Sequence, residues 1–277
     1  MYPTEAFRKK GDVSAEFIRR TPGRKFPTPS GKETAGKQIP VSNSIGTVDR
    51  LWRYPVKSMR GEELETAFVG FGGVYGDRLL AFRNSASPKI FPYLTARQLQ
   101  TMLLYCPRFR DGEAMVDVQT PDGEMLSIDD PALIRKLGDG LTDAPTLTLL
   151  RSDRAMTDCR PISLFSLQTV RQIGDEIGVA LDPVRFRANI YLDLADKAGF
   201  GEDELVGHSL RLGASAVISV LERDKRCKMI SLDPHTAISN PAVLRSVAHN
   251  HDGKAGVYAA VLVEGTVCKG DTVDLLD

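Results

Sequence analysis

The chain lacks a net charge, a long apolar run and a secretory leader, and each absence excludes a class of protein. Lysine plus arginine and aspartate plus glutamate are equal at 36 each, so no overall field attracts nucleic acid or an anionic membrane. No apolar run approaches the roughly 18 residues of a spanning helix, and the first residues lack the apolar core of a signal peptide. We therefore expect a cytoplasmic protein with no nucleic-acid or membrane partner, in which any bound anion is held by a local cluster.

Cysteine usage excludes two further classes. The four cysteines, Cys106, Cys159, Cys227 and Cys268, form no C-x-x-C pair and no zinc-ribbon spacing. Dispersed thiols in a cytosolic chain are expected to stay reduced, so no disulfide framework is predicted. The HNH run at 249–251 offers two imidazoles to a metal, but a polar helix end explains it as well.

Residues 1–45 differ in composition from the rest of the chain. They are rich in Pro, Gly, Thr and Lys with few apolar anchors, which predicts a flexible tail. Glu5 and Glu16 count against a mitochondrial presequence, because such peptides avoid acidic residues. From Thr47 onward, β-branched and aromatic residues mix with turn-forming glycines, and residues 152–161 are typical of a joint between two β-rich halves.

Sequence signals predict four short helices among these strands. Thr95 and Gln98 form a capping box ahead of an apolar run. Asp130 followed by proline starts a second helix. An apolar stripe over 167–178 predicts a third helix that ends in glycine, and an asparagine cap followed by proline predicts a fourth from residue 240.

The strand signals extend to the end of the chain. Pro121 to Gly123 predict the turn of a hairpin. The run KMISLD at 228–233 is interpreted as a strand, and residues 256–276 as a long strand pair that turns at Glu264–Gly265, with a second tight turn at KGD. A closed or nearly closed barrel removes the edges of so many strands, so we expect a mainly β (α+β) fold.

Cys227 has unusual neighbours for a thiol, because Arg226 and Lys228 flank it. Nearby cations favour the thiolate, which is the form that attacks electrophiles and binds soft metals. An inert interior thiol is the competing interpretation.

Basic and polar residues recur at predicted strand ends and turns. Charge-assisted hydrogen bonds from such groups are what holds a phosphate in proteins. Any one of them alone is typical of a solvated surface. The candidates are Lys57, Ser58, Arg78, Asp158, Arg160, Ser163, Arg185, Arg187 and Asn189.

Taken in order, these segments resemble the MOSC family, the molybdenum cofactor sulfurase C-terminal domain, preceded by its N-terminal β-barrel partner. The matching pieces include LWRYPVKSMRGE, YGDRLLAF, DCRPISLFS, RFRANI and RCKMISLDPHT. The resemblance covers roughly residues 46–277 and is strongest to proteins of the amidoxime-reducing type. It implies a smaller β-rich N-terminal domain at 46–150 and a barrel-like MOSC domain with a few peripheral helices at 151–277.

The resemblance also implies roles for individual residues. Cys227 matches the thiolate ligand of molybdenum in a molybdenum-pterin cofactor. Asp158 matches a residue that lines the site and is the candidate proton relay, because reducing an N–O bond consumes protons. Asn189 matches a residue that supports the pterin. The residues that match the pterin and phosphate contacts, or that line the site, are Lys57, Ser58, Arg78, Cys159, Arg160 and Arg187.

Four positions depart from the family pattern. Cys159 and Arg160 stand where eukaryotic relatives tend to have small residues, and Asp224 stands where a cysteine is common. These changes put substrate preference in doubt. Ala237 replaces a frequent glycine, from which we expect a different turn geometry.

The resemblance implies an oxidoreductase that reduces N-hydroxylated or related N-oxygenated small molecules. No C-x₄-C-x₂-C run is present and the chain closes after the last predicted strands, so we expect a separate electron-transfer protein of the ferredoxin or flavin reductase type. A cofactor carrier or sulfur relay that uses Cys227 is the alternative, and a β-barrel interaction protein with a vacant site is the third.

Overall fold

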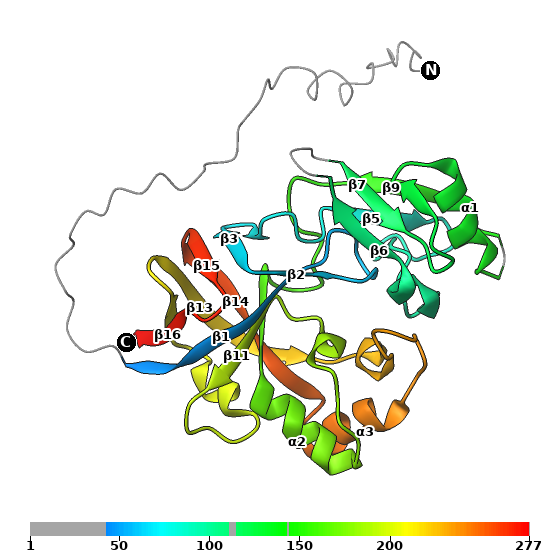
Figure 1. Ribbon diagram of the computed structural model, residues 1–277. Helices are drawn as coiled ribbons and strands as arrows, with labels where there is room; N and C mark the ends of the chain where they lie inside the picture. The colour runs from blue at the N-terminus through cyan, green and yellow to red at the C-terminus, as the bar shows by residue number, and fades with distance from the viewer. Residues whose placement is uncertain (1–42, 111–114, 143, 277) are drawn as a thin grey trace, which may run out of the picture. The chain divides into compact units, whose positions relative to one another are not determined.

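The computed structural model describes residues 43–110, 115–142 and 144–276 (Figure 1). The predicted flexible tail at 1–45 lies almost wholly outside the described residues. Among the helices that are described, none is both long and apolar enough to cross a membrane.

Seven strands close into a barrel, so the predicted mainly β fold is confirmed (Figure 1). Their order around the barrel is β11, β10, β14, β13, β12, β16 and β1, and β1 pairs back onto β11. Closure leaves none of these strands with an open edge, and the inward side chains form an aliphatic core. The strands are β1 (Ser44–Arg53), β10 (Ile162–Ser166), β11 (Ile190–Leu194), β12 (Ser209–Leu212), β13 (Ala216–Lys225), β14 (Lys254–Val263) and β16 (Thr272–Leu276).

Strand β1 joins the two halves of the chain, because it lies early in the sequence yet pairs with two late strands. Thr47 is opposite Asp193 on β11 and Thr272 on β16. Gly46 allows this close approach, since a Cβ there would lie 2.2 Å from the Asp193 carbonyl oxygen. The two halves therefore share one sheet, and the predicted division near residue 150 stays a prediction.

Smaller sheets carry the rest of the first half. The hairpin predicted around Gly123 is confirmed, because β7 pairs with β8 and Gly123 has a φ of 88°. A second apolar core lies among these elements. The strands of the smaller sheets are β3 (Thr66–Gly70), β4 (Gly73–Val74), β5 (Leu80–Asn84), β6 (Cys106–Phe109), β7 (Val116–Gln119), β8 (Met125–Ser127) and β9 (Leu147–Arg151), with β15 (Gly265–Cys268) added to β3 from the end of the chain. Strand β2 (Glu62–Leu64) instead pairs with β1 at the edge of the barrel sheet.

Three α-helices, α1 (Pro131–Asp139), α2 (Leu167–Ile177) and α3 (Pro241–Asn250), are described. Their caps follow the sequence signals: the Asp130 and Asn240 side chains accept backbone N–H groups, and Gly178 ends α2 in a left-handed conformation. The Thr95–Gln98 capping box forms only in part. The Thr95 N–H donates to Gln98 Oε1 at 2.9 Å, but the turn that follows is a 3₁₀ helix, η2 (Gln100–Leu104).

Two strand predictions near the end of the chain are wrong. The KMISLD segment is not a strand but the 3₁₀ helix η5 (Lys228–Ser231), because its apolar side chains divide between two cores: Ile230 packs beside the helices and Leu232 with the first half. Strands β14 and β15 do not pair with each other, since β14 joins the barrel and β15 pairs with β3. The remaining 3₁₀ helices are η3 (Pro183–Phe186) and η4 (Gly201–Leu205).

Candidate functional site

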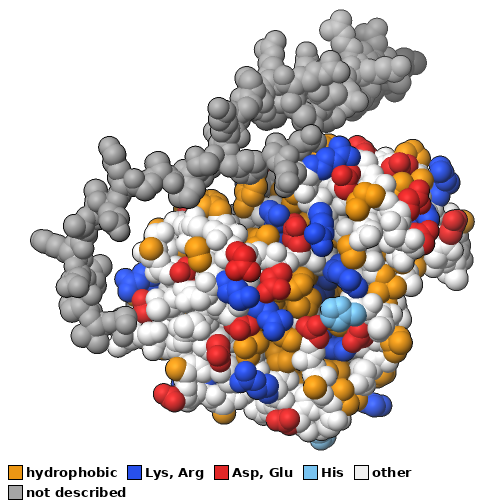
Figure 2. Space-filling model, in the orientation of Figure 1, with side chains coloured by type: hydrophobic (Ala, Val, Ile, Leu, Met, Phe, Trp, Pro, Cys, Tyr) orange, Lys and Arg blue, Asp and Glu red, His pale blue; other side chains and the backbone are white. Residues whose placement is uncertain are grey.

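A cavity of about 190 Å³ opens where the barrel meets the loop after β1. Basic side chains outnumber carboxylates around it by seven to two. Figure 2 shows lysine and arginine side chains gathered near the middle of one face, with carboxylates among them. The predicted site residues that line the cavity are Lys57, Ser58, Arg78, Asp158, Arg160, Arg187, Asn189 and Cys227.

Cys159 is the predicted residue that does not line the cavity. Its exposed thiol lies 3.5 Å from Glu222 Oε1. Partial burial and the Glu222 carboxylate both raise the pKa of the Cys159 thiol. Arg160 binds the same carboxylate at 2.7 Å, and this ion pair is exposed to solvent. Cys159 lies beside the ion pair and is not among the residues that line the cavity.

Three lining residues have a backbone conformation that only glycine adopts freely. Ser58, Arg78 and Arg187 have φ values of 68°, 47° and 57°. Such strain costs about 1 kcal/mol or more per residue and persists where surrounding contacts enforce it. Here the left-handed conformation directs the side chains of Ser58, Arg78 and Arg187 toward one cavity.

Arg78 and Arg187 are held together around Tyr54. The Tyr54 ring is fully buried, and the two guanidinium carbons lie 4.6 and 4.3 Å from its centroid. Arg78 Nη1 lies 2.5 Å from the buried Asp77 carboxylate, and Arg78 Nη2 donates to the Arg187 carbonyl at 3.0 Å. Arg78 is therefore fully partnered and fixed relative to Arg187.

Arg187 has no such carboxylate. Among the described residues, its buried Nη2 atom has no hydrogen-bond partner. Burial lowers the pKa of Arg187 to about 10, and the nearby Arg78 charge acts in the same direction. Arg187 lines the cavity, and a buried donor without an acceptor is unfavourable unless a ligand supplies the acceptor.

Lys57 is buried beneath the cavity and bonded to Asp158. Its Nζ lies 2.5 Å from Asp158 Oδ1 and 2.8 Å from the Met156 carbonyl, and it also faces the Phe91 and Tyr93 rings. Burial lowers the pKa of Lys57, and Asp158 opposes this. Burial would raise the pKa of Asp158, but Lys57 outweighs it and lowers that pKa, so the carboxylate stays ionised.

Cys227 lies half-buried at the start of η5, where it also lines the cavity. Its neighbour Arg226 contacts Asp224 and donates to the Phe186 carbonyl. The Arg226 charge that sequence reasoning assigned to the thiol is thus shared with Asp224. Burial raises the pKa of Asp224, and burial together with the Asp224 charge raises the pKa of its hydrogen-bond partner Tyr258.

Asn189 fixes the strands behind the cavity. Its side-chain oxygen accepts the Ser163 N–H at 3.3 Å, and its amide donates to the Trp52 carbonyl at 3.3 Å. The structure thus shows this residue bracing the backbone, and its predicted contact with a pterin stays a prediction.

The comparisons identify the family. The MOSC domain family matches residues 151–274, and the MOSC N-terminal beta barrel domain family matches residues 45–141. The chain is a MOSC domain protein. A search of curated proteins found no match.

Among solved structures, this MOSC protein is similar to the YuaD protein from Bacillus subtilis, with 15% identity and a TM-score of 0.45 over 83% of this chain and 94% of that one. YiiM from Geobacillus stearothermophilus is 21% identical with a TM-score of 0.34, and YiiM from Escherichia coli is 20% identical with a TM-score of 0.32. Each YiiM alignment covers 43% of this chain and 55% of the other.

The cavity of this MOSC protein fits an anionic metal-pterin group. The unpartnered Arg187 donor and the excess of basic side chains favour an anion, and Cys227 adds a soft sulfur atom to the lining of the same cavity. The described residues contain no cluster of three His, Cys, Asp or Glu side chains that would hold a bare metal ion.

Sequence reasoning missed several residues that shape this site. Tyr54, which contacts both arginines, stands in the quoted YPVKS segment but gave no signal of its own. Tyr258, on barrel strand β14, and Arg97, between β5 and η2, also line the cavity, and only the tertiary fold brings them together. The turn at Ala237 was expected to differ from a glycine turn, yet its φ of 58° is the left-handed conformation that glycine favours, so that expectation is wrong.

Proposed function

We propose that this MOSC protein is a molybdenum-dependent oxidoreductase that reduces N-hydroxylated or related N-oxygenated small molecules. The observation that carries the proposal is the buried Arg187 donor without an acceptor, in a basic cavity that also presents the Cys227 thiol. A phosphorylated pterin that carries a soft metal would satisfy both groups.

The chain's own residues divide into those for the metal and those for the anion. Cys227 Sγ would bind molybdenum, and the cofactor would supply a two-electron redox centre for oxygen removal. Lys57, Ser58, Arg78 and Arg187 would bind the pterin and its phosphate. Arg160 and Asn189 would support its edges. Arg78 is held rigidly by Asp77, which lowers the cost of ordering this anion site on binding.

Asp158 is the proposed proton carrier. Reduction of an N–O bond takes two electrons and two protons, breaks that bond and releases one water. Asp158 Oδ2 would receive a proton from solvent at the cavity mouth and pass it to the leaving oxygen, while Lys57 Nζ holds Oδ1 in place, and solvent would supply the second proton. The electrons would come from a separate ferredoxin or flavin reductase type protein, in the cytoplasm that the sequence predicts.

Elemental analysis tests the cofactor. Protein purified from cells with intact cofactor synthesis is expected to contain about one molybdenum and one pterin phosphate per chain, and Cys227→Ala much less molybdenum. Cys159→Ala is the matched control, because this thiol lies outside the cavity lining and its loss should leave the molybdenum content unchanged.

A reduced-dye assay tests the reaction. Oxidation of the dye by hydroxylamine-type compounds, lost in Cys227→Ala, supports the reductase. Molybdenum bound without turnover of any such compound would instead favour the cofactor carrier or sulfur relay, and equal molybdenum in wild type and Cys227→Ala would remove Cys227 from the metal.

A further inference from the structure

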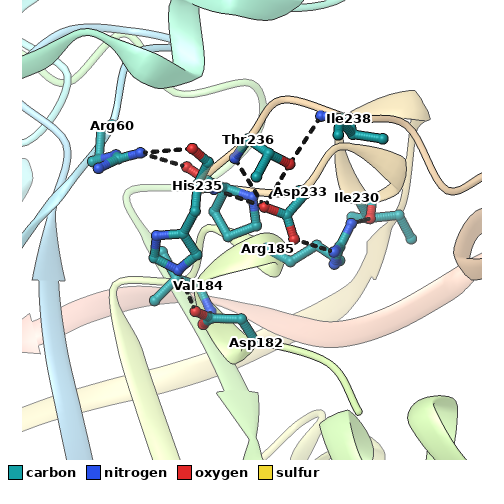
Figure 3. A network of polar contacts seen from close by, with 10 residues as sticks. Arg60, Asp182, Val184, Arg185, Ile230, Asp233, His235, Thr236 and Ile238 are labelled. Carbon is teal, nitrogen blue, oxygen red and sulfur yellow. Dashed lines mark hydrogen bonds and ion pairs between the residues drawn. The ribbon is translucent and has the colours of Figure 1, made fainter. Parts of the chain in front are cut away.

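A polar network behind the cavity connects the three chain segments that carry its key residues (Figure 3). One segment contains η3 and leads into Arg187. A second segment, residues 227–238, starts at Cys227. The third is the loop after β1, where Arg60 follows Ser58 by two residues.

The second segment, residues 227–238, forms hydrogen bonds with both of the other segments. Arg185, from η3, donates to Asp233 Oδ2 at 3.1 Å and to the Ile230 carbonyl at 3.4 Å. His235 Nε2 lies 2.7 Å from Asp182 Oδ2, on the residue that caps η3. Arg60 Nη2 donates to the Pro234 and His235 carbonyls at 3.1 and 3.4 Å.

Asp233 also organises its own turn. Its Oδ1 accepts the N–H groups of His235 and Thr236 at 3.0 and 2.9 Å, and the Thr236 hydroxyl at 3.0 Å. One carboxylate oxygen thus fixes the turn, and the other binds Arg185. Figure 3 shows the two oxygens directed to these separate partners.

The Arg185–Asp233 pair is close to the site but is not part of it. Neither residue lines the cavity, whereas Arg187 and Cys227 at the ends of their segments do. Arg185 is 7% exposed, and its buried Nε has no partner among the described residues. Asp233 is the carboxylate that binds this buried guanidinium directly, and its loss removes that hydrogen bond.

We propose that Arg185 and Asp233 are a positioning pair that sets the Cys227 segment against the Arg187 segment, and so aligns the thiol with the anion site. The role of this alignment rests on the proposed function, but the coupling between the two segments can be measured in protein without cofactor. Loss of comparable supporting contacts around metal sites reduces affinity by about 10- to 100-fold.

The Asp233→Asn variant distinguishes a positioning role of Asp233 from a direct effect of its negative charge on anion binding. The asparagine oxygen can still accept the turn's N–H groups, while its NH₂ group faces Arg185 and breaks the link. Removing a carboxylate makes the surroundings more positive, so electrostatics alone would tighten anion binding. Positioning predicts the opposite, a rise of about tenfold in the Kd for inorganic phosphate.

Asp274→Asn is the matched control. Asp274 is also a buried carboxylate bonded to an arginine, with its Oδ2 2.7 Å from Arg211 Nη2, but it lies on barrel strand β16 and does not line the cavity. We expect Asp274→Asn to lower stability without changing the phosphate Kd, because the loss of an ion pair alone does not move the cavity walls.

Two measurements on full-length protein prepared without cofactor test the proposal. In hydrogen exchange, Asp233→Asn should speed exchange in both residues 182–187 and residues 227–232, whereas Asp274→Asn should not. Faster exchange confined to the turn at 233–238, or an unchanged or lower phosphate Kd in Asp233→Asn, would overturn it. A wild type that binds no phosphate would instead refute the anion site of the proposed function, and the exchange comparison would still decide the coupling.

Discussion

Replacing Arg187 by methionine should stabilise the cofactor-free protein while abolishing its anion affinity. Methionine keeps an unbranched apolar chain in place of the arginine stem and removes a charge that has no acceptor on Nη2. Binding sites often destabilise the unliganded protein, so that replacing a binding residue raises stability while it removes affinity for the ligand.

The magnitude follows from the pKa of Arg187. Its fall from the ordinary arginine value to about 10 corresponds to about 3 kcal/mol of unfavourable charge burial, an upper limit because part of the residue still contacts solvent. Loss of the cation–π contact with Tyr54 costs about 1–2 kcal/mol in return. The net gain is about 1 kcal/mol, or about 2–4 °C in Tm. Because the folded state binds this proton less tightly than the unfolded state, the penalty is full at neutral pH and fades above about pH 10.

Thermal unfolding with and without phosphate is the assay. Wild-type protein should gain stability with phosphate, and Arg187→Met should start higher and gain nothing. Arg211→Met is the control with the opposite sign, since it leaves the buried Asp274 without its arginine and should lower the Tm while keeping the response to phosphate. An Arg187→Met protein that is less stable than wild type, or that still responds to phosphate, would refute the reasoning.

Three further predictions concern single residues. Asp158→Asn should tighten phosphate binding, because Lys57 Nζ is freed, and lower stability by about 1–2 kcal/mol; calorimetry that shows weaker binding would contradict this. Glu176 links α2 to α3 through Asn250 and His251. Burial alone would raise the pKa of Glu176, but hydrogen bonds from Ser246, Asn250 and His251 lower it to about 2. The stability it contributes is therefore present at neutral pH and lost as pH falls from about 4.5 to 2, so Tm values of wild type and Glu176→Gln should converge over that range; a constant difference would be evidence against it. Ala237→Gly should raise the unfolding free energy by up to about 1 kcal/mol in denaturant titrations, because it removes left-handed strain, and a loss would show that the turn is relaxed.

Local signals in the sequence predicted local structure well. The Asp130 and Asn240 caps and the glycine at 178 act within one turn of the helices they bound, so no distant contact can override them. KMISLD failed because a short apolar run has the same pattern in a strand and in a tight helix, and the choice depends on which cores receive Ile230 and Leu232.

The cavity lining could be predicted from the segments that carry the family resemblance. Lysine, arginine and cysteine in the matching segments identified the cavity wall, and the structure brings those segments together. Contacts between distant segments gave no signal, as with Tyr54 beneath the two arginines or Asp233 beside Arg185. Arg226 also pairs with Asp224, so less of its positive charge acts on Cys227 than the local sequence alone indicates.

X-ray absorption at the molybdenum edge of the purified protein tests the central claim most directly. A pterin dithiolene supplies two sulfur neighbours, and the account predicts a third from Cys227. A metal with only two sulfur neighbours, or a preparation made with intact cofactor synthesis that holds no molybdenum, would contradict it.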